Sequence, residues 1–167
     1  GAAYIPREIA NSLNQFRNDP APQFTLEQLD GSSYPMQSLN GKIVLLDFFA
    51  TWCAPCMLEL PILEKLYNKY KSERVKFFLI DITEGTRTMP GYEDAPKAGP
   101  FLKKKGVTMP ILYDTRGVAM ERYNAITLPR LYIIDGNRKI TQIREGFHNE
   151  EKFTKELSAE IDRLLGE

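Results

Sequence analysis

The sequence predicts an α/β fold in which a mixed central sheet carries helices on both faces. In the first half, near-continuous apolar runs alternate with amphipathic helical patterns, and a hairpin followed by a helix closes the chain. The chain has 167 residues, of which 43% are hydrophobic, enough to bury one core. We therefore expect a single domain over residues 1–167.

The first 40 residues predict a helix followed by a small hairpin. Four apolar residues fall on one helical stripe: Ile5, Ile9, Leu13 and Phe16. Pro20 and Pro22 end this helix, because a residue that precedes proline is disfavoured in the helical region. Asp30-Gly31 is a turn dipeptide between two apolar segments, which favours a hairpin.

Two buried strands and a helix follow. Residues 42–49 and 75–82 are apolar runs typical of parallel strands covered on both faces. Between them, residues 56–70 predict a helix. Its expected core stripe is Leu58, Ile62, Leu66 and Tyr70, and the residues expected to face water are Glu59, Glu64, Lys65 and Lys69.

The second half predicts shorter elements. Residues 83–99 have weak periodicity and predict a loop. The later elements are a short helix within 101–105, a strand over 110–113, a helix over 118–123, a hairpin of 131–134 with 139–143, and a closing helix over 153–165.

The charge balance excludes some classes of function. Lysine plus arginine and aspartate plus glutamate each count 22, so the net charge is zero and a nucleic-acid partner is not expected. The longest apolar runs are only four residues, so no membrane-spanning segment is expected. The first residues show no signal-peptide pattern.

Cys53 and Cys56 are the only cysteines, and they indicate reversible thiol chemistry. Two thiols and one histidine cannot complete a tetrahedral zinc site, and the loop between the thiols is too short to constrain the unfolded chain. Cys53 lies where a strand ends and a helix begins, so the helix amides should lower its pKa. Half of a metal site, or an inert bridge, remains the alternative.

The stretch Trp52-Cys53-Ala54-Pro55-Cys56, between a strand and a helix, resembles the active site of thioredoxins. Other residues match the family at its spacing: Asp47 as the buried aspartate, Pro61 as the helix-kinking proline, Thr127-Leu128-Pro129 as the cis-proline loop, and Gly146 after the last hairpin strand. The resemblance covers about residues 40–165. It implies a thioredoxin fold and a thiol–disulfide oxidoreductase.

The sequence departs from thioredoxin proper at Ala54, which replaces the usual glycine. Two additions resemble one subgroup, the extracytoplasmic TlpA-like thioredoxins: residues 1–40 add a helix and hairpin, and about residues 83–108 form an insertion after the second core strand. The subgroup reduces selected disulfides, including those of cytochrome c precursors. The resemblance therefore implies a periplasmic or otherwise extracytoplasmic location, and no metal or other cofactor.

The expected roles follow from the resemblance and from thiol chemistry. Cys53 attacks a substrate disulfide, Cys56 resolves the mixed disulfide, and Asp47, with a pKa raised by burial, accepts the proton of Cys56. Glu84 falls where some of the subgroup place a glutamate near the active site. The residues expected to bind substrate are Trp52, Thr127, Leu128 and Pro129, and those with a structural role are Ala54, Pro55 and Pro61.

The expected partners are protein disulfides and an upstream dithiol electron donor, for which a membrane-bound protein is one candidate; we expect a monomer. Two alternatives stay open. A copper-binding module of the same fold would want a nearby histidine, and only His148 exists. A peroxiredoxin-like peroxidase is suggested by residues 21–24, but Ala50 and Leu46 occupy the positions of its catalytic cysteine motif.

Overall fold

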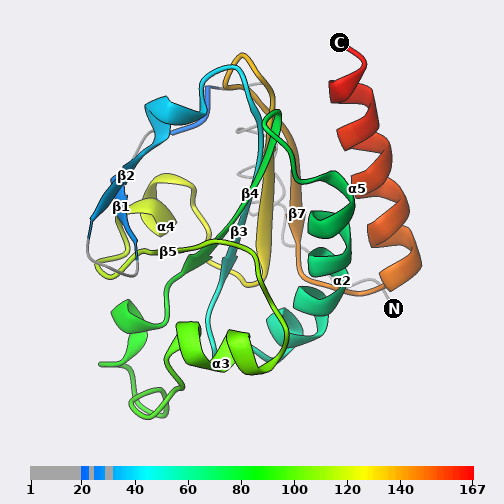
Figure 1. Ribbon diagram of the computed structural model, residues 1–167. Coiled ribbons are helices and arrows are strands. Elements are labelled where there is room, and N and C mark those ends of the chain that lie inside the picture. Colours follow the sequence, from blue (N-terminus) through cyan, green and yellow to red (C-terminus); the bar gives the residue numbers. More distant parts are fainter. Residues whose placement is uncertain (1–19, 23–24, 29–31) are drawn as a thin grey trace, which may run out of the picture.

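The computed structural model describes residues 20–22, 25–28 and 32–167 (Figure 1). Among these, seven strands form one mixed sheet in the order β2-β1-β5-β4-β3-β6-β7. The strands are β1 (Thr25–Glu27), β2 (Ser33–Pro35), β3 (Ile43–Phe49), β4 (Val75–Asp81), β5 (Ile111–Tyr113), β6 (Arg130–Ile134) and β7 (Ile140–Glu145). The helices are α2 (Ala54–Tyr70), α3 (Ala98–Lys104), α4 (Val118–Arg122) and α5 (Glu150–Leu165), with 3₁₀ turns at Met36–Leu39 and Glu84–Thr86.

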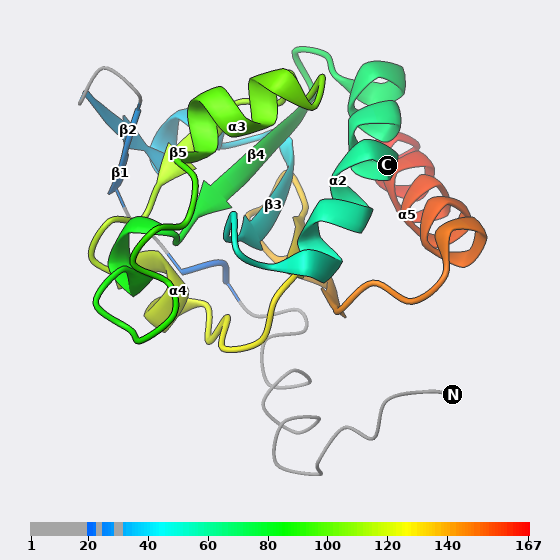
Figure 2. The same ribbon diagram turned by 90° about the horizontal axis from the view of Figure 1, so that it is seen from below.

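The helices cover both faces of the sheet, as the sequence predicts. Strands β3, β4 and β5 are parallel neighbours, and β6 and β7 add to β3 in antiparallel fashion. Helices α2, α3 and α5 lie on one face and α4 on the other (Figure 2). The two connections between parallel strands, through α2 and α3, therefore run over the same face. This is expected, because both connections step in the same direction along the sheet and both are right-handed.

The N-terminal hairpin extends the sheet at its β5 edge. Strands β1 and β2 pair antiparallel, with Leu26 opposite Tyr34, and β1 reaches the core sheet through the single pair of Glu27 with Tyr113. The hairpin is thus confirmed, whereas the expected helix over residues 5–16 and the turn Asp30-Gly31 lie outside the described residues. Within the described part of the chain, no helix combines the length and apolar character needed to cross a bilayer.

The predicted strands and helices are found with small differences in their ends. Every residue of β3 and β6 is buried, which explains why both read as apolar runs. Helix α2 begins at Ala54, two residues earlier than expected, because Cys53 serves as its N-cap. The loop after β4 contains the 3₁₀ turn at Glu84–Thr86, and β7 extends to Glu145.

The expected buried face of α2 was right at Leu66 but wrong at Leu58, Glu59 and Glu64. Leu58 is 65% exposed, whereas Glu59 and Glu64 are buried. The buried face consists of Cys56, Glu59, Leu60, Leu63, Glu64 and Leu66. Glu64 is stable there because its carboxylate accepts hydrogen bonds from the backbone N–H groups of Thr108 and Met109, at 2.6 and 3.1 Å.

Candidate active site

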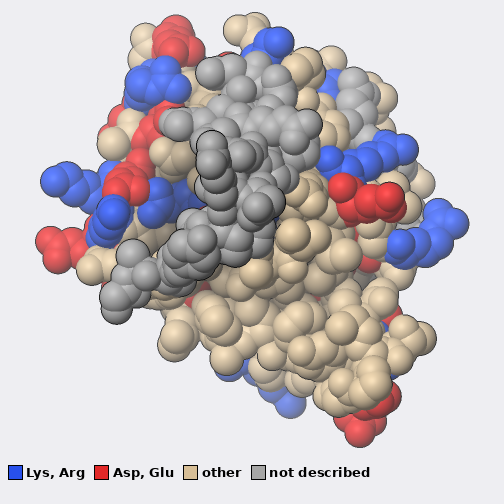
Figure 3. Space-filling view, turned by 180° about the vertical axis from the view of Figure 1, so that it is seen from behind, with Lys and Arg blue, Asp and Glu red and all other residues tan. Residues whose placement is uncertain are grey.

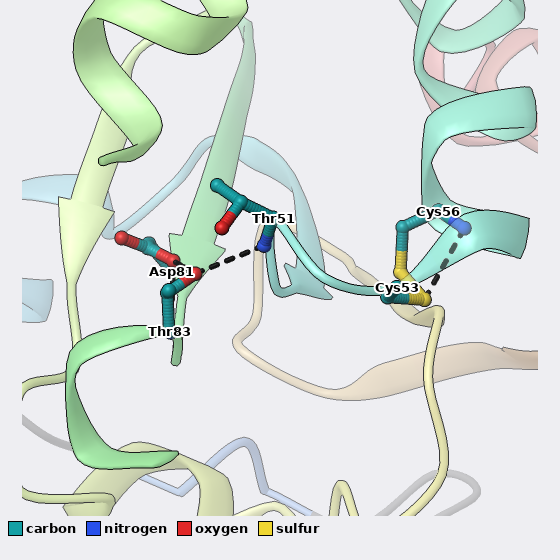
Figure 4. The surroundings of a disulfide bond; sticks show 5 residues. All are labelled: Thr51, Cys53, Cys56, Asp81 and Thr83. Atoms are coloured by element: carbon teal, nitrogen blue, oxygen red, sulfur yellow. Dashed lines mark hydrogen bonds between the residues drawn. A yellow bond between two sulfur atoms is a disulfide. The ribbon is translucent and has the colours of Figure 1, made fainter. Parts of the chain in front are cut away.

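Cys53 and Cys56 form a disulfide at the start of α2 (Figure 4). Their Cα atoms are 5.3 Å apart, and the Cys53 Sγ accepts a hydrogen bond of 3.3 Å from the Cys56 backbone N–H. Cys53 is 5% exposed and Cys56 is fully buried. The sulfur that is reachable from solvent is therefore the one that faces the free amides of the helix start, where a negative charge is stabilised.

A hydrogen-bond network that the sequence reading missed fixes the turn before Cys53. The Thr51 N–H donates to Thr83 Oγ1 at 2.9 Å (Figure 4). Thr83 in turn donates through its N–H and hydroxyl to Asp81 Oδ1. The Thr51 hydroxyl donates to the carbonyl of Pro96 at 2.7 Å. The turn is therefore attached both to the end of β4 and to the segment that precedes α3.

The loop of residues 124–129 lies beside the disulfide, and its Leu128–Pro129 peptide bond is cis, as expected. The N–H of Gly146 donates to the Pro129 carbonyl at 2.9 Å. Arg130 is 1% exposed and donates to the Asn124 carbonyl and to Thr127 Oγ1, at 2.9 and 2.7 Å. Arg130 thus holds the loop from beneath, a role that no motif in the sequence indicates.

Two carboxyl groups are buried against each other, one of them on the helix that begins at the disulfide. Asp47 lies in β3 and Glu59 lies one helical turn after Cys56; each is 1% exposed. Burial and the neighbouring Glu59 raise the pKa of Asp47 well above its usual range, and burial raises the pKa of Glu59 to about 7. Among the described residues, no group donates a hydrogen bond to either Asp47 oxygen or to Glu59 Oε1. Because the pKa of Asp47 is raised, a proton held on its carboxyl would supply a donor to Glu59.

Glu84 is held in an ion pair outside this group. Its carboxylate accepts hydrogen bonds from Arg87 Nε and Nη2 at 2.7 and 2.8 Å, and this pairing lowers the pKa of Glu84. Arg87 also donates to the Ala95 carbonyl at 2.6 Å. The pair braces residues 84–95, and the buried glutamate of the site is Glu59, which the sequence reading had placed in water.

An open pocket of about 550 Å³ adjoins Cys53. Its lining brings together several residues that the sequence analysis selected, namely Trp52, Cys53, Ala54, Pro55, Thr127 and Leu128. Pro129 is buried at the end of the loop of residues 124–129, and Pro61 lies further along α2. The lining also includes Thr86, Met89 and Tyr92 from the segment after β4. Across residues 20–22, 25–28 and 32–167, no cluster of three or more His, Cys, Asp or Glu side chains could hold a metal ion.

The chain is similar to curated thiol–disulfide oxidoreductases. It is 30% identical over 139 residues to the thiol-disulfide oxidoreductase ResA of Geobacillus kaustophilus, a match that covers 83% of this chain and 75% of that protein. It is 33% identical over 137 residues to the thioredoxin-like protein YneN of Bacillus subtilis, covering 82% of this chain and 76% of that protein.

A solved structure supports the same relationship. The solution structure of a Bacteroides thetaiotaomicron protein, provisionally described as a protein disulfide isomerase, superposes with a TM-score of 0.74 at 29% identity. That match covers 90% of this chain and 91% of the other. The Redoxin family model matches residues 16–160. With its disulfide at a helix start, its cis-proline loop and these relatives, the chain belongs to the Redoxin family of the thioredoxin superfamily, as a TlpA-like thiol–disulfide oxidoreductase.

Proposed function

We propose that this thiol–disulfide oxidoreductase acts as a reductase of protein disulfides in an extracytoplasmic compartment. The observation that carries the proposal is the placement of the disulfide: Cys53 caps α2, Cys56 is buried behind it, and an open pocket and the cis-proline loop adjoin Cys53. The compartment and the reducing direction are supported by the resemblance to the TlpA-like subgroup.

The proposed reaction begins with the reduced protein. The Cys53 thiolate attacks one sulfur of the substrate disulfide, so that a mixed disulfide forms and the other substrate sulfur leaves as a thiolate. The Cys56 thiolate then attacks the Cys53 Sγ, which forms the Cys53–Cys56 disulfide of this structure and releases the second substrate sulfur. Two electrons have passed to the substrate, and an upstream dithiol must reduce the protein again.

Cys56 must lose a proton before it can attack. Asp47 and Glu59 are the candidate acceptors, because they are buried, they interact with each other, and Glu59 lies one helical turn after Cys56. An acceptor works best when its pKa lies near the working pH, and Glu59 titrates at about 7. We propose that the pair takes the proton of Cys56, with Asp47 in the role that the sequence analysis gave it.

The loop of residues 127–129 is proposed to bind the substrate backbone. The Leu128 backbone lies at the pocket, where it can pair with an extended substrate segment in the manner of an added strand. Thr127 accepts a hydrogen bond from Arg130 and donates one to Glu145 Oε1 at 2.6 Å, and these bonds hold the loop. Trp52 lines the same pocket, where it contacts Thr86 and Tyr92. Glu84 is proposed to act through Arg87, by bracing the segment that faces Trp52.

The decisive experiment combines a redox titration of the Cys53–Cys56 pair with reduction assays. We expect the reduced protein to reduce insulin and an oxidised Cys-x-x-Cys-His peptide, the haem-attachment sequence of c-type cytochromes. Cys53→Ser should abolish both reactions, and Cys56→Ser should accumulate mixed disulfides. Normal turnover in either variant would contradict the mechanism, and failure with the peptide alone would remove cytochrome c precursors from the proposed substrates.

A further inference from the structure

We propose that the pocket beside Cys53 is a subsite that binds a large apolar side chain next to the substrate disulfide. The inference rests on the proposed function and names the class of substrate that the protein prefers. Its wall comes from the segment after β4, which the thiol chemistry described above does not use. The subsite would make this segment a determinant of specificity.

The wall is built on Trp52. The Tyr92 ring stacks on the Trp52 indole with a centroid distance of 4.2 Å and an angle of 12°. The Trp52 Nε1–H donates to Thr86 Oγ1 at 2.8 Å. Met89, which lies between these two contacts in the sequence, lines the pocket and is 47% exposed. Residues 86–92 are thus joined directly to the residue that precedes the nucleophile.

The wall is also fixed at both ends. Thr51, in the turn before Cys53, is bonded to both ends of this segment. Its N–H donates to Thr83 Oγ1, and its hydroxyl donates to the Pro96 carbonyl. Arg87 links Glu84 to the Ala95 carbonyl across the same segment. Because these bonds join parts of the protein to one another, they hold the wall in place, and a bound side chain need not order it.

The residues that line the pocket favour binding of an apolar side chain of the substrate. None of the residues that line the pocket is charged. The Thr86 hydroxyl already donates to the Thr83 carbonyl and accepts from Trp52, and the Thr127 hydroxyl donates to Glu145 and accepts from Arg130. In Figure 3, charged side chains are sparse over the lower half of the face shown, toward the end of the molecule where α2 begins in Figure 1. A charged substrate residue would lose water here and find no charged partner among the lining residues.

The opposite wall places the guest beside the proposed backbone site. Met120, Ile126 and Leu128 line it, and Ile126 is 63% exposed, unusual for a large aliphatic side chain. A substrate strand paired with the Leu128 backbone would direct alternate side chains to one side, as strands do. The geometry therefore points to a polypeptide with an aromatic or long aliphatic residue near the reacting cysteine as the occupant.

The test uses two disulfide peptides that differ only in the residue next to the reacting cysteine, phenylalanine in one and aspartate in the other. We expect reduced wild-type protein to cleave the phenylalanine peptide at least about tenfold faster, the range that an apolar pocket provides. Met89→Lys adds a cation to the wall and should abolish or reverse this preference. Val118→Lys is the matched control, because Val118 is 39% exposed and does not line the pocket, and it should keep the preference.

The outcomes separate this inference from the proposed function. Reaction of the reduced wild-type protein with a small symmetrical disulfide, 5,5′-dithiobis(2-nitrobenzoate), reports the thiol chemistry without the subsite. If that reaction proceeds but the two peptides react equally, or if Met89→Lys keeps the tenfold preference, the subsite is refuted and the proposed function stands. If Cys53 does not react even with the small disulfide, both are refuted. Tyr92→Ala, which removes the stack, should lower the preference as well.

Discussion

Replacing Glu59 with glutamine should remove a pH-dependent loss of stability. The folded protein holds the Glu59 proton up to a pKa of about 7, whereas the reference value for an exposed glutamate is 4.5. The neutral carboxyl is thus favoured in the folded state. Stability is therefore highest below about pH 4.5, is lost as the pH rises toward 7, and stays low above it.

The size of the loss follows from the same values. One pKa unit corresponds to about 1.4 kcal/mol, so the rise from 4.5 to about 7 costs roughly 3 kcal/mol once both states are ionised. Part of this cost is already present at about pH 5, so between about pH 5 and about pH 8 the free energy of unfolding of wild type should fall by roughly 2–3 kcal/mol through Glu59. The Glu59→Gln side chain has no proton to lose and keeps a donor for Asp47. The free energy of unfolding of this variant should therefore fall less than that of wild type by the same amount.

Urea unfolding of the oxidised protein at the two pH values, followed by circular dichroism, measures the effect by linear extrapolation. Glu73→Gln is the matched control, because it removes one carboxylate from a side chain that is 94% exposed. The difference in pH dependence between the two variants isolates the buried carboxyl. Equal losses of stability in wild type and Glu59→Gln would refute the reasoning that Glu59 is buried beside Asp47 and ionises near neutral pH.

Three further predictions test other parts of the structure. Asp47→Asn should slow resolution of the mixed disulfide by about a hundredfold near pH 7, and the difference in rate from wild type should narrow at higher pH, where Cys56 ionises unaided. Rapid-quench analysis measures both rates, and a ratio of the two rates that does not change with pH would contradict the prediction. Arg130→Met removes the hydrogen bonds that hold Thr127 and should raise KM for peptide disulfides about tenfold in steady-state assays. An unchanged KM would mean that the loop of residues 124–129 keeps its structure without Arg130. Glu64→Ala leaves the Thr108 N–H without its acceptor and should lower the free energy of unfolding by about 2 kcal/mol, so an effect below about 0.5 kcal/mol would count against that contact.

The strands and the disulfide position could be predicted because each leaves a local signal. A continuous apolar run admits few structures, so β3 and β4 were found nearly to the residue. The motif around Cys53 placed the start of α2 to within two residues, and the family resemblance predicted the cis bond at Pro129. These features depend on neighbours in the sequence or on a motif with fixed spacing.

The buried face of α2 could not be read from periodicity alone. Apolar residues occur around the whole first half of the helix, so two faces fit an apolar stripe equally well. Tertiary contacts select the second face, since Asp47 and Thr108 supply partners for glutamates there. One signal was available: if Cys56 is taken as buried, the helical spacing of three, four and seven places Glu59, Leu60 and Leu63 beside it.

The supports of the site left no signal in the sequence. Thr51, Asp81 and Thr83 belong to no motif, and their bonds exist because β4 ends level with the turn before Cys53, as the pairing of Phe49 with Asp81 shows. The wall provided by Tyr92 depends on a loop of weak periodicity folding over Trp52. Contacts of this kind follow from register and from loop path, which composition does not encode locally.

The burial that costs stability at Asp47 and Glu59 is also what suits the pair to its proposed chemistry. In water both carboxyls would be ionised well below neutral pH and would hold a proton too weakly to take one from a thiol in step with attack. Burial raises both pKa values, so near pH 7 the pair is poised between binding and releasing a proton. Reduction of the disulfide creates a Cys56 thiol, and oxidation removes its proton. The protonation state of Asp47 and Glu59 should therefore change together with the redox state of the cysteines. A substitution at Glu59 that stabilises the protein should weaken this coupling.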